Sequence, residues 1–247
     1  MKQKNMLQRP AFIALLFALT ITCSQCSFAE GRVIKGDGHV VTTTHQVTYF
    51  NALDLQGAFS NVQLIPGTDL MVTMETDQNL QDLFLIETTN ETLQISSDRE
   101  TILQPTSMHL TIIYPDLNKI TIGGACKISS VGKIAAENLS LEISGAADLD
   151  LQVEVGFLRT QVSGAGNIVL EGLAEEHEIR LSGASNLNAA NLATESTQVH
   201  LSGAGSASVN ATTSLEANLS GIGKITYSGD PKEKIINKSG LGSISAR

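Results

Sequence analysis

Aromatic side chains are scarce in this chain of 247 residues: tryptophan is absent, and phenylalanine and tyrosine supply 4% of the positions. The tyrosines, Tyr49, Tyr114 and Tyr227, are scattered along the sequence. Aromatic rings offer the large flat apolar faces on which a sugar ring can stack. The sequence therefore provides few platforms for sugar binding of that kind.

Cysteine is equally rare. Of the three cysteines, Cys23 and Cys26 lie near the N-terminus and only Cys126 lies further along. If the first two are removed with a leader, no intramolecular disulfide can form, so stability must come from burial and backbone pairing. No partners for metal binding recur near Cys126, which we interpret as a small structural side chain.

Long apolar segments are absent apart from one short run over residues 11–22. Three basic residues precede this run and Ser27-Phe28-Ala29 follows it, so residues 1–29 have the pattern of a secretory signal peptide. A membrane-spanning helix needs about 20 residues, so we predict no transmembrane span. We expect export to the periplasm, the outer surface or the medium, with a lipid anchor at Cys23 or Cys26 as the alternative.

Positive charge is also in short supply. The formal net charge is −9, from 16 Lys and Arg against 25 Asp and Glu. Removal of Lys2, Lys4 and Arg9 with the leader leaves 13 basic residues against the same 25 acids, which gives −12. Such a chain is a poor ligand for a polyanion, so nucleic acid is excluded as a partner.

What the chain does have is a repeat. Close copies of Leu-Ser-Gly-Ala-Ser-Asn-Leu, the sequence of residues 181–187, recur through the second half. Their glycines are Gly124, Gly145, Gly164, Gly183, Gly203, Gly221 and Gly240, with successive spacings of 21, 19, 19, 20, 18 and 19 residues. A fixed period near twenty predicts a solenoid, and the leucine-rich repeat pattern of similar length is absent.

Alignment on these glycines shows which positions face the interior. Positions two before, four before and four after the glycine are mainly aliphatic, and the positions between them are polar, which is the alternation of half-buried strands. The column two before the glycine contains Ile122, Ile143, Val162, Leu181, Leu201 and Leu219. The sequence predicts an all-β fold, a parallel β-helix (solenoid) of about 19–20 residues per rung.

The repeated motif itself predicts a corner. Small residues follow the glycine in every rung before Ile222 and Leu241, and glycine among them can adopt the positive φ that sharp bends often require. The serine that precedes each of these glycines except Gly124 is expected to bond to another hydroxyl or to corner backbone groups. A serine nucleophile is not indicated, because no histidine and acid columns accompany the serines.

Residues 30–117 are strand-like but lack the regular rung. Within them, residues 53–64 repeat the aliphatic spacing around Gly57, with the second arm displaced by one residue, so we predict a degenerate coil near an N-terminal cap. Thr89-Asn90-Glu91 is a hairpin candidate. We predict a signal peptide over 1–29 and one β-helical domain over 30–247, irregular over 30–117 and regular over 118–247.

Patterns typical of catalysis, cofactor binding or metal binding are absent. The five histidines occupy different columns, the Gly-Ala-Gly stretches open strands instead of helices, and no carboxylate cluster spans adjacent rungs. Glu175, Glu176, His177 and Glu178 are predicted to lie in a solvated turn. The outward line of Asn167, Asn186 and Ser206 is the candidate contact face, and we predict no catalytic, cofactor-binding or metal-binding residue.

Several features together resemble a known family. The leader, the irregular first half with Phe-Asn-Ala-Leu-Asp-Leu-Gln-Gly from Phe50, the turn at residues 77–80 and the Ser-Gly-Ala-Gly rungs are similar to the bacterial adhesin-head family called the GIN domain, over about residues 45–245. The resemblance implies an exported β-helical protein with no established enzyme activity. The family defines no site residues.

We therefore predict an exported, non-catalytic binding module, adhesin-like, whose partner is a surface ligand, either a glycan or a protein. Two alternatives stay open. Parallel β-helices also carry calcium-dependent polysaccharide lyases and hydrolases, and coil ends and flat faces can stack into a self-assembling scaffold or homo-oligomer.

Overall fold

A computed structural model describes residues 32–97 and 101–247, which are almost entirely β-strand. The strands of the irregular part are β1 (Arg32–Lys35), β2 (Val40–Gln46), β3 (Ala52–Gln56), β4 (Ala58–Pro66), β5 (Met71–Asp77), β6 (Phe84–Thr89), β7 (Thr92–Ser97), β8 (Thr101–Gln104), β9 (Met108–Tyr114) and β10 (Lys119–Ile122), with one 3-10 helix, η1 (Gln78–Leu83). The regular part contains β11 (Ala125–Ile143), β12 (Ala146–Val162), β13 (Ala165–Leu181), β14 (Ala184–Leu201), β15 (Ala204–Leu219), β16 (Ile222–Ser228), β17 (Glu233–Lys238) and β18 (Leu241–Ala246).

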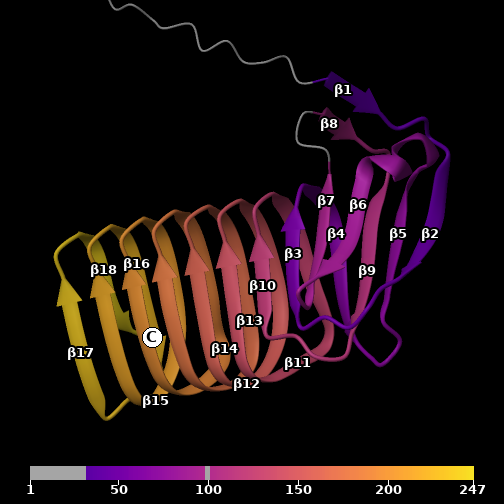
Figure 1. Ribbon diagram of the computed structural model, residues 1–247. Helices are drawn as coiled ribbons and strands as arrows, with labels where there is room; N and C mark the ends of the chain where they lie inside the picture. Colours follow the sequence, from indigo (N-terminus) through magenta and orange to yellow (C-terminus); the bar gives the residue numbers. More distant parts are fainter. Residues whose placement is uncertain (1–31, 98–100) are drawn as a thin grey trace, which may run out of the picture. The chain divides into compact units, whose positions relative to one another are not determined.

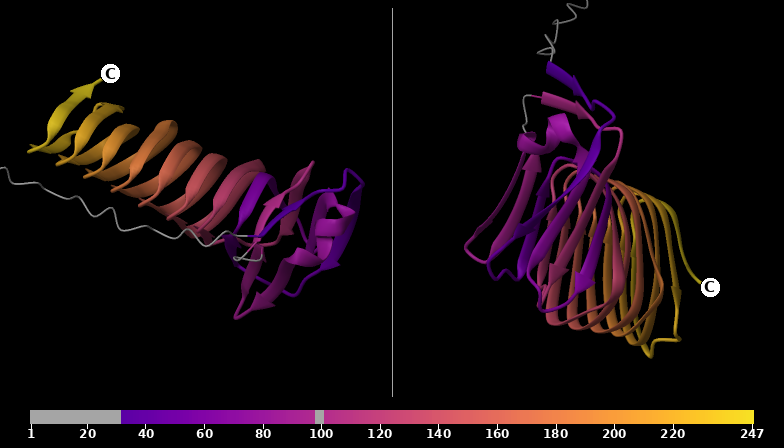
Figure 2. Two further views of the ribbon diagram at one scale, coloured as in Figure 1. Left: turned by 90° about the horizontal axis from the view of Figure 1, so that it is seen from above. Right: turned by 90° about the vertical axis from the view of Figure 1, so that its right-hand side faces the viewer.

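The predicted β-helix is confirmed: the strands form a solenoid of about 7 turns, in which successive coils pair in parallel (Figures 1 and 2). Each of β11 to β15 runs from one corner to the next, because ladder pairing continues around the bends of a coil. The register aligns Ile143 with Val162, Val162 with Leu181 and Leu181 with Leu201, so the columns read from the sequence are real files of side chains.

The aliphatic columns form the core. Members of the column two before the glycine are at most 2% exposed from Ile122 through Leu219. The columns four before and four after are equally buried from Ile120 to Ala217 and from Ile128 to Ile225. Because every coil adds the same inward positions, the stacked columns together form one continuous hydrophobic core.

Close stacking explains the glycine at each corner. A Cβ added to Gly183 would lie 1.8 Å from the carbonyl oxygen of Gly164, and one added to Gly164 would lie 1.8 Å from that of Gly145. No real Cβ tolerates such a distance from backbone, so the column can contain only glycine. The glycines of this column have no positive φ. Positive φ occurs two residues later, at Gly166, Gly205 and Gly242, as expected for glycines among the small residues of the bend.

The corner serines bond to the coil before them, as expected for one of the two options. The hydroxyl of Ser163 donates to the carbonyl oxygen of Ile143 at 3.4 Å, and that of Ser182 donates to Val162 at 3.3 Å. Backbone amides of the same serines reach the same carbonyls at 2.8 and 2.9 Å. Each corner is thus tied to its neighbour by main chain and side chain together.

The irregular part contains the predicted degenerate coil. β3 pairs with β10 and β4 with β11, and a Cβ on Gly124 would lie 1.8 Å from the carbonyl oxygen of Gly57, so Gly57 is the first member of the glycine column. The one-residue displacement is a bulge, since Cys126 aligns with Phe59 but Ile128 aligns with Val62. The hairpin is also confirmed: Asn90 and Glu91, both with positive φ, connect β6 to β7.

Beyond this first coil the sheet changes to antiparallel pairing of β5 with β2 and β9 (Figure 1). The carboxylate of Asp77 is buried there and accepts hydrogen bonds from the amides of Gly38 at 2.8 Å and Thr106 at 2.7 Å, and from the Thr106 hydroxyl. The Thr106 hydroxyl is the largest cause of the lowered pKa of Asp77. One ionised side chain therefore joins three segments of this part.

The last coil is less enclosed. Ile236 is 44% exposed in a column that is buried elsewhere, and Lys238, which stands in the column two before the glycine, donates to the carbonyl of Gly242 at 3.1 Å. The predicted signal peptide lies outside the described residues. Over residues 32–97 and 101–247, no helix is long and apolar enough to cross a membrane.

Replacement of Gly183 by alanine tests the corner. Because the new Cβ would meet the backbone of Gly164, we expect the free energy of unfolding to fall by at least about 3 kcal/mol. Ala184→Ser, at the exposed next position, is the matched control and should change stability by less than about 0.5 kcal/mol. Equal denaturation midpoints for the two variants would show that the glycines do not set the coil spacing.

Candidate functional site

The predicted contact face exists as an aligned column. Asn167 pairs in register with Asn186, and Asn186 with Ser206. The side chains bond to each other: Asn186 Nδ2 donates to Asn167 Oδ1 at 3.3 Å, and Ser206 Oγ donates to Asn186 Oδ1 at 2.9 Å. Asn167 Nδ2 in turn donates to Asp148 at 3.0 Å. Its role as a contact face stays a prediction.

The acidic segment at residues 175–178 corrects our expectation of a solvated turn. These residues lie inside β13, and His177 is 2% exposed, with its Nε2 at 3.0 Å from the hydroxyl oxygen of Thr160. Burial lowers the pKa of His177 to about 3, so the ring is neutral at ordinary pH. The sequence does indicate this burial. The position six before the glycine is an inward column that contains Leu139, Leu158, His177, Thr197 and Leu215.

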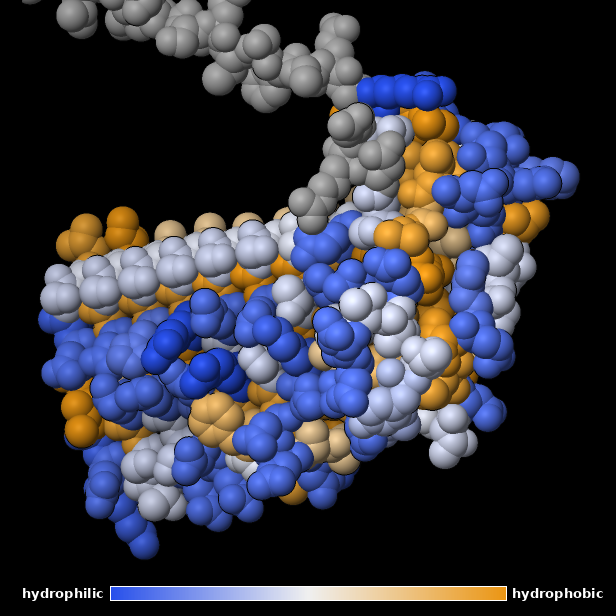
Figure 3. All heavy atoms as spheres, viewed as in Figure 1, coloured by the Kyte–Doolittle hydropathy of each residue, from blue (hydrophilic) through white to orange (hydrophobic). Residues whose placement is uncertain are grey.

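Outward residues beside this column form a groove, here called the polar groove, with a volume of about 310 Å³. One wall contains Phe157, Glu176, Ser196, Ser214 and Glu233, and the other contains Glu178, Gln198, Glu216 and Ile235. Each wall is a register column, so the groove crosses successive coils. Small Ser196 and Ser214 hollow its middle, and polar side chains cover much of the visible face of these coils (Figure 3).

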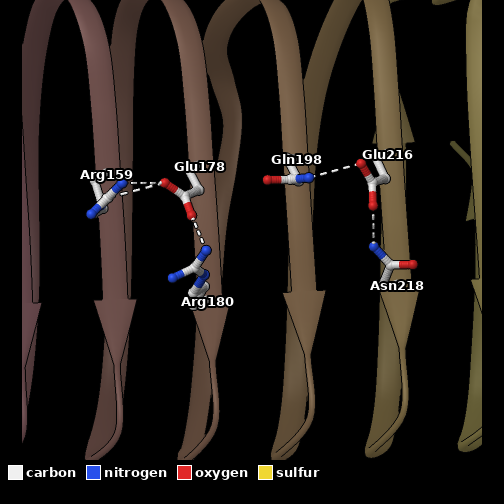
Figure 4. Close-up of polar contacts among 6 residues, drawn as sticks. All are labelled: Arg159, Glu178, Arg180, Gln198, Glu216 and Asn218. Carbon is white, nitrogen blue, oxygen red and sulfur yellow. Dashed lines mark hydrogen bonds and ion pairs between the residues drawn. The ribbon is translucent and has the colours of Figure 1, made fainter.

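Glu178 is fixed by two arginines. Its Oε2 lies 2.7 Å from Arg159 Nη2 and 3.0 Å from Arg159 Nε, and its Oε1 lies 2.6 Å from Arg180 Nη2 (Figure 4). The Glu178 side chain is only 12% exposed, whereas the arginines are about half exposed. The carboxylate is thus held at one orientation by charge-assisted bonds from two coils.

Glu216 is fixed by amides instead. Gln198 Nε2 donates to its Oε2 at 2.7 Å and Asn218 Nδ2 donates to its Oε1 at 2.8 Å (Figure 4). The bond from Asn218, the bond from Gln198 and the nearby His200 lower the pKa of Glu216 against the opposing effect of burial. The carboxylates of Glu178 and Glu216 are therefore oriented before any partner arrives.

This geometry does not match the usual acid and base pair of a glycosidase, in which one carboxyl group has a raised pKa. Glu216 has a lowered pKa, and both Glu178 oxygens already have arginine partners. Among residues 32–97 and 101–247, no group of three His, Cys, Asp or Glu side chains could hold a metal ion.

A second groove lies beside the polar groove, since Glu175 lines it and the next residue, Glu176, lines the polar groove. We call it the aliphatic groove; its volume is about 460 Å³. Val155, Leu173, Ala174 and Ala193 are part of its apolar lining, and Glu154, Glu175 and Glu195 are its acids. Sequence reasoning found neither groove, because both depend on which side chains are short at positions that adjacent coils bring together.

The stacked parallel coils and outward grooves define the class of the protein as a β-solenoid with surface recesses. The model of one family, described as Putative auto-transporter adhesin, head GIN domain, matches residues 49–231. The chain belongs to this family, as the sequence resemblance predicted.

Several solved structures have a similar fold. A putative adhesin from Bacteroides fragilis is 28% identical, with a TM-score of 0.83 over 87% of this chain and 100% of its own. A putative lipid binding protein from Parabacteroides distasonis is 19% identical, with a TM-score of 0.72 over the same shares. A putative adhesin from Parabacteroides merdae is 19% identical, with a TM-score of 0.63 over 87% and 99%. No curated protein matches the chain.

The burial of His177 predicts that the stability of the fold depends on pH. Its folded pKa of about 3 lies below the ordinary value of 6.5, so below pH 6.5 the unfolded chain binds a proton that the folded chain does not. Through this residue, the free energy of unfolding should fall by about 1.5 kcal/mol between pH 6.5 and pH 5.

Denaturant titrations at several pH values measure this effect. The double variant Thr160→Val/His177→Leu removes both partners of the buried bond and should lose this part of the pH dependence. His39→Gln, at an exposed position, is the control and should retain it. An unchanged slope in the double variant would contradict the assignment.

Proposed function

We propose that this protein is an exported, non-catalytic binding module of adhesin type that contacts its partner through the outward faces of the coils. It acts in the periplasm, at the outer surface or in the medium, after removal of residues 1–29, with residues 30–247 as one domain. Membership of an adhesin-head family supports a role in surface binding. The groove geometry supports binding without chemistry.

The observation that carries this proposal is the cross-coil fixation of groove side chains. Arg159, Glu178 and Arg180 are joined across β12 and β13, and Gln198, Glu216 and Asn218 across β14 and β15. Side chains that are already ordered lose little conformational entropy when a partner binds. A wall of such side chains on a rigid ladder is suited to recognition.

The two alternative functions, an enzyme and a self-assembling scaffold, would require different features. A calcium-dependent polysaccharide enzyme would need a set of carboxylates for the ion and an acid with a raised pKa. A self-assembling scaffold would associate through its own faces or coil ends and would require no other partner. The module proposed here binds saturably, turns over nothing and does not depend on calcium.

The test uses the mature chain, residues 30–247, immobilised on beads. We expect saturable adhesion to at least one surface in a panel of envelope fractions, polysaccharides and matrix proteins, competed by the soluble chain and unaffected by a chelator. Chelator-sensitive degradation of a polysaccharide would contradict the proposal in favour of the enzyme. Concentration-dependent self-association with no adhesion would favour the scaffold.

Two variants then locate the contact face. Ser214→Trp fills the polar groove and should reduce adhesion at least about fivefold, because shape complementarity is lost at its centre. The triple variant Asn167→Ala/Asn186→Ala/Ser206→Ala removes the column predicted from the sequence. Loss of adhesion in the triple variant alone would assign the contact to that column, and circular dichroism with a denaturation midpoint checks that both variants fold.

A further inference from the structure

The aliphatic groove combines an apolar lining with an acidic rim. Leu173 is 53% exposed, although the other leucines of the regular coils before the last coil, where Leu241 is exposed, are buried. Gly156, Ala174 and Ala193 have no side chain or a small one, which leaves room for the recess. An exposed leucine beside such a recess is a candidate contact for an aliphatic side chain of a partner.

The acids on the rim differ in their partners. Glu154 lies 2.8 Å from Lys133, just as Glu142 outside the groove lies 2.9 Å from Lys119. By contrast, Glu175 and Glu195 have no hydrogen bond or ion pair with any residue of the described ranges. No Lys or Arg lines either groove.

The register of β13 and β14 also brings these two carboxylates together. Ala174 aligns with Thr194 and Glu176 with Ser196, which places Glu175 opposite Glu195 on the neighbouring strand. Adjacent strands are about 4.8 Å apart, and like charges directly opposite each other destabilise a sheet. The free protein therefore carries a repulsion in the lining of the aliphatic groove that a bound cation would relieve.

We propose that the aliphatic groove binds a segment of a protein partner that presents aliphatic side chains to Leu173 and lysine or arginine side chains to Glu175 and Glu195. The occupant is argued from charge complementarity together with the apolar lining. This inference rests on the proposed function, because it names the partner class of the same binding module.

Other ligand classes fit this groove less well. An anionic lipid or an acidic polysaccharide would bring negative charge to a rim where two carboxylates already face each other. A neutral glycan would gain little, since no aromatic side chain lines this groove. A basic, aliphatic polypeptide satisfies the apolar lining and the carboxylates at once.

The experiment titrates the mature chain with three synthetic peptides of equal length, followed by fluorescence anisotropy. One alternates lysine with leucine, one alternates glutamate with leucine, and one alternates lysine with serine. We expect the lysine–leucine peptide to bind at least about tenfold more tightly than either of the others, and its binding to weaken as salt is raised, because the contact is partly electrostatic.

Variants connect the binding to the groove. Glu175→Gln/Glu195→Gln should weaken binding of the lysine–leucine peptide at least about tenfold and should leave the denaturation midpoint unchanged or raised, since a repulsion is removed. Leu173→Ser should weaken it without altering the salt dependence. Glu87→Gln/Asp150→Asn changes the net charge equally at exposed positions elsewhere and should bind as the wild type does.

Three results would overturn the inference: equal binding of the lysine–serine peptide, which would show simple charge attraction; equal weakening by the control variant; or tighter binding of the glutamate–leucine peptide. Each leaves the proposed function intact if bead adhesion persists. If bead adhesion fails while the lysine–leucine peptide still binds at the groove, the peptide site stands and the adhesin role is lost.

Discussion

The close approach of successive corners is the constraint on which the rest of the structure depends. At each corner the glycine of one coil lies against the carbonyl oxygen of the glycine before it, from Gly57 through Gly240. That approach sets the register of every coil, because a coil that shifted by one residue would turn its aliphatic side chains outward. The interior and exterior columns both follow from this contact.

The same ladder gives the surface its properties. Because each outward position is repeated at every coil, a few substitutions in one column change a large, flat area. Where the repeated residues are Asn167, Asn186 and Ser206, the side chains bond to one another along the column. Where the small side chains of Ser196 and Ser214 follow Phe157 in the same column, the face is recessed. The recesses of this solenoid thus arise where side-chain size changes along a column.

Some carboxylates of the protein are held by internal partners. Glu178 is paired with Arg159 and Arg180, and Glu216 accepts hydrogen bonds from two amides, so both carboxylates of the polar groove have a fixed orientation. Two acids of the aliphatic groove, Glu175 and Glu195, have no such partners in the described ranges. A protein with a strongly negative charge attracts basic partners over a distance, and carboxylates without an internal partner are available to bind them.

The sequence by itself determined the coil, because the Ser-Gly spacing and the aliphatic columns are local consequences of stacking, and even the one-residue bulge after Gly57 was visible. It did not determine the grooves. For His177 the signal was present, since Leu158, His177 and Thr197 share the position six before the glycine, but the acidic residues beside the histidine resemble a solvated turn when they are read alone. The depth of each groove depends on which side chains about twenty residues apart are large or small, and tertiary structure alone brings those side chains together.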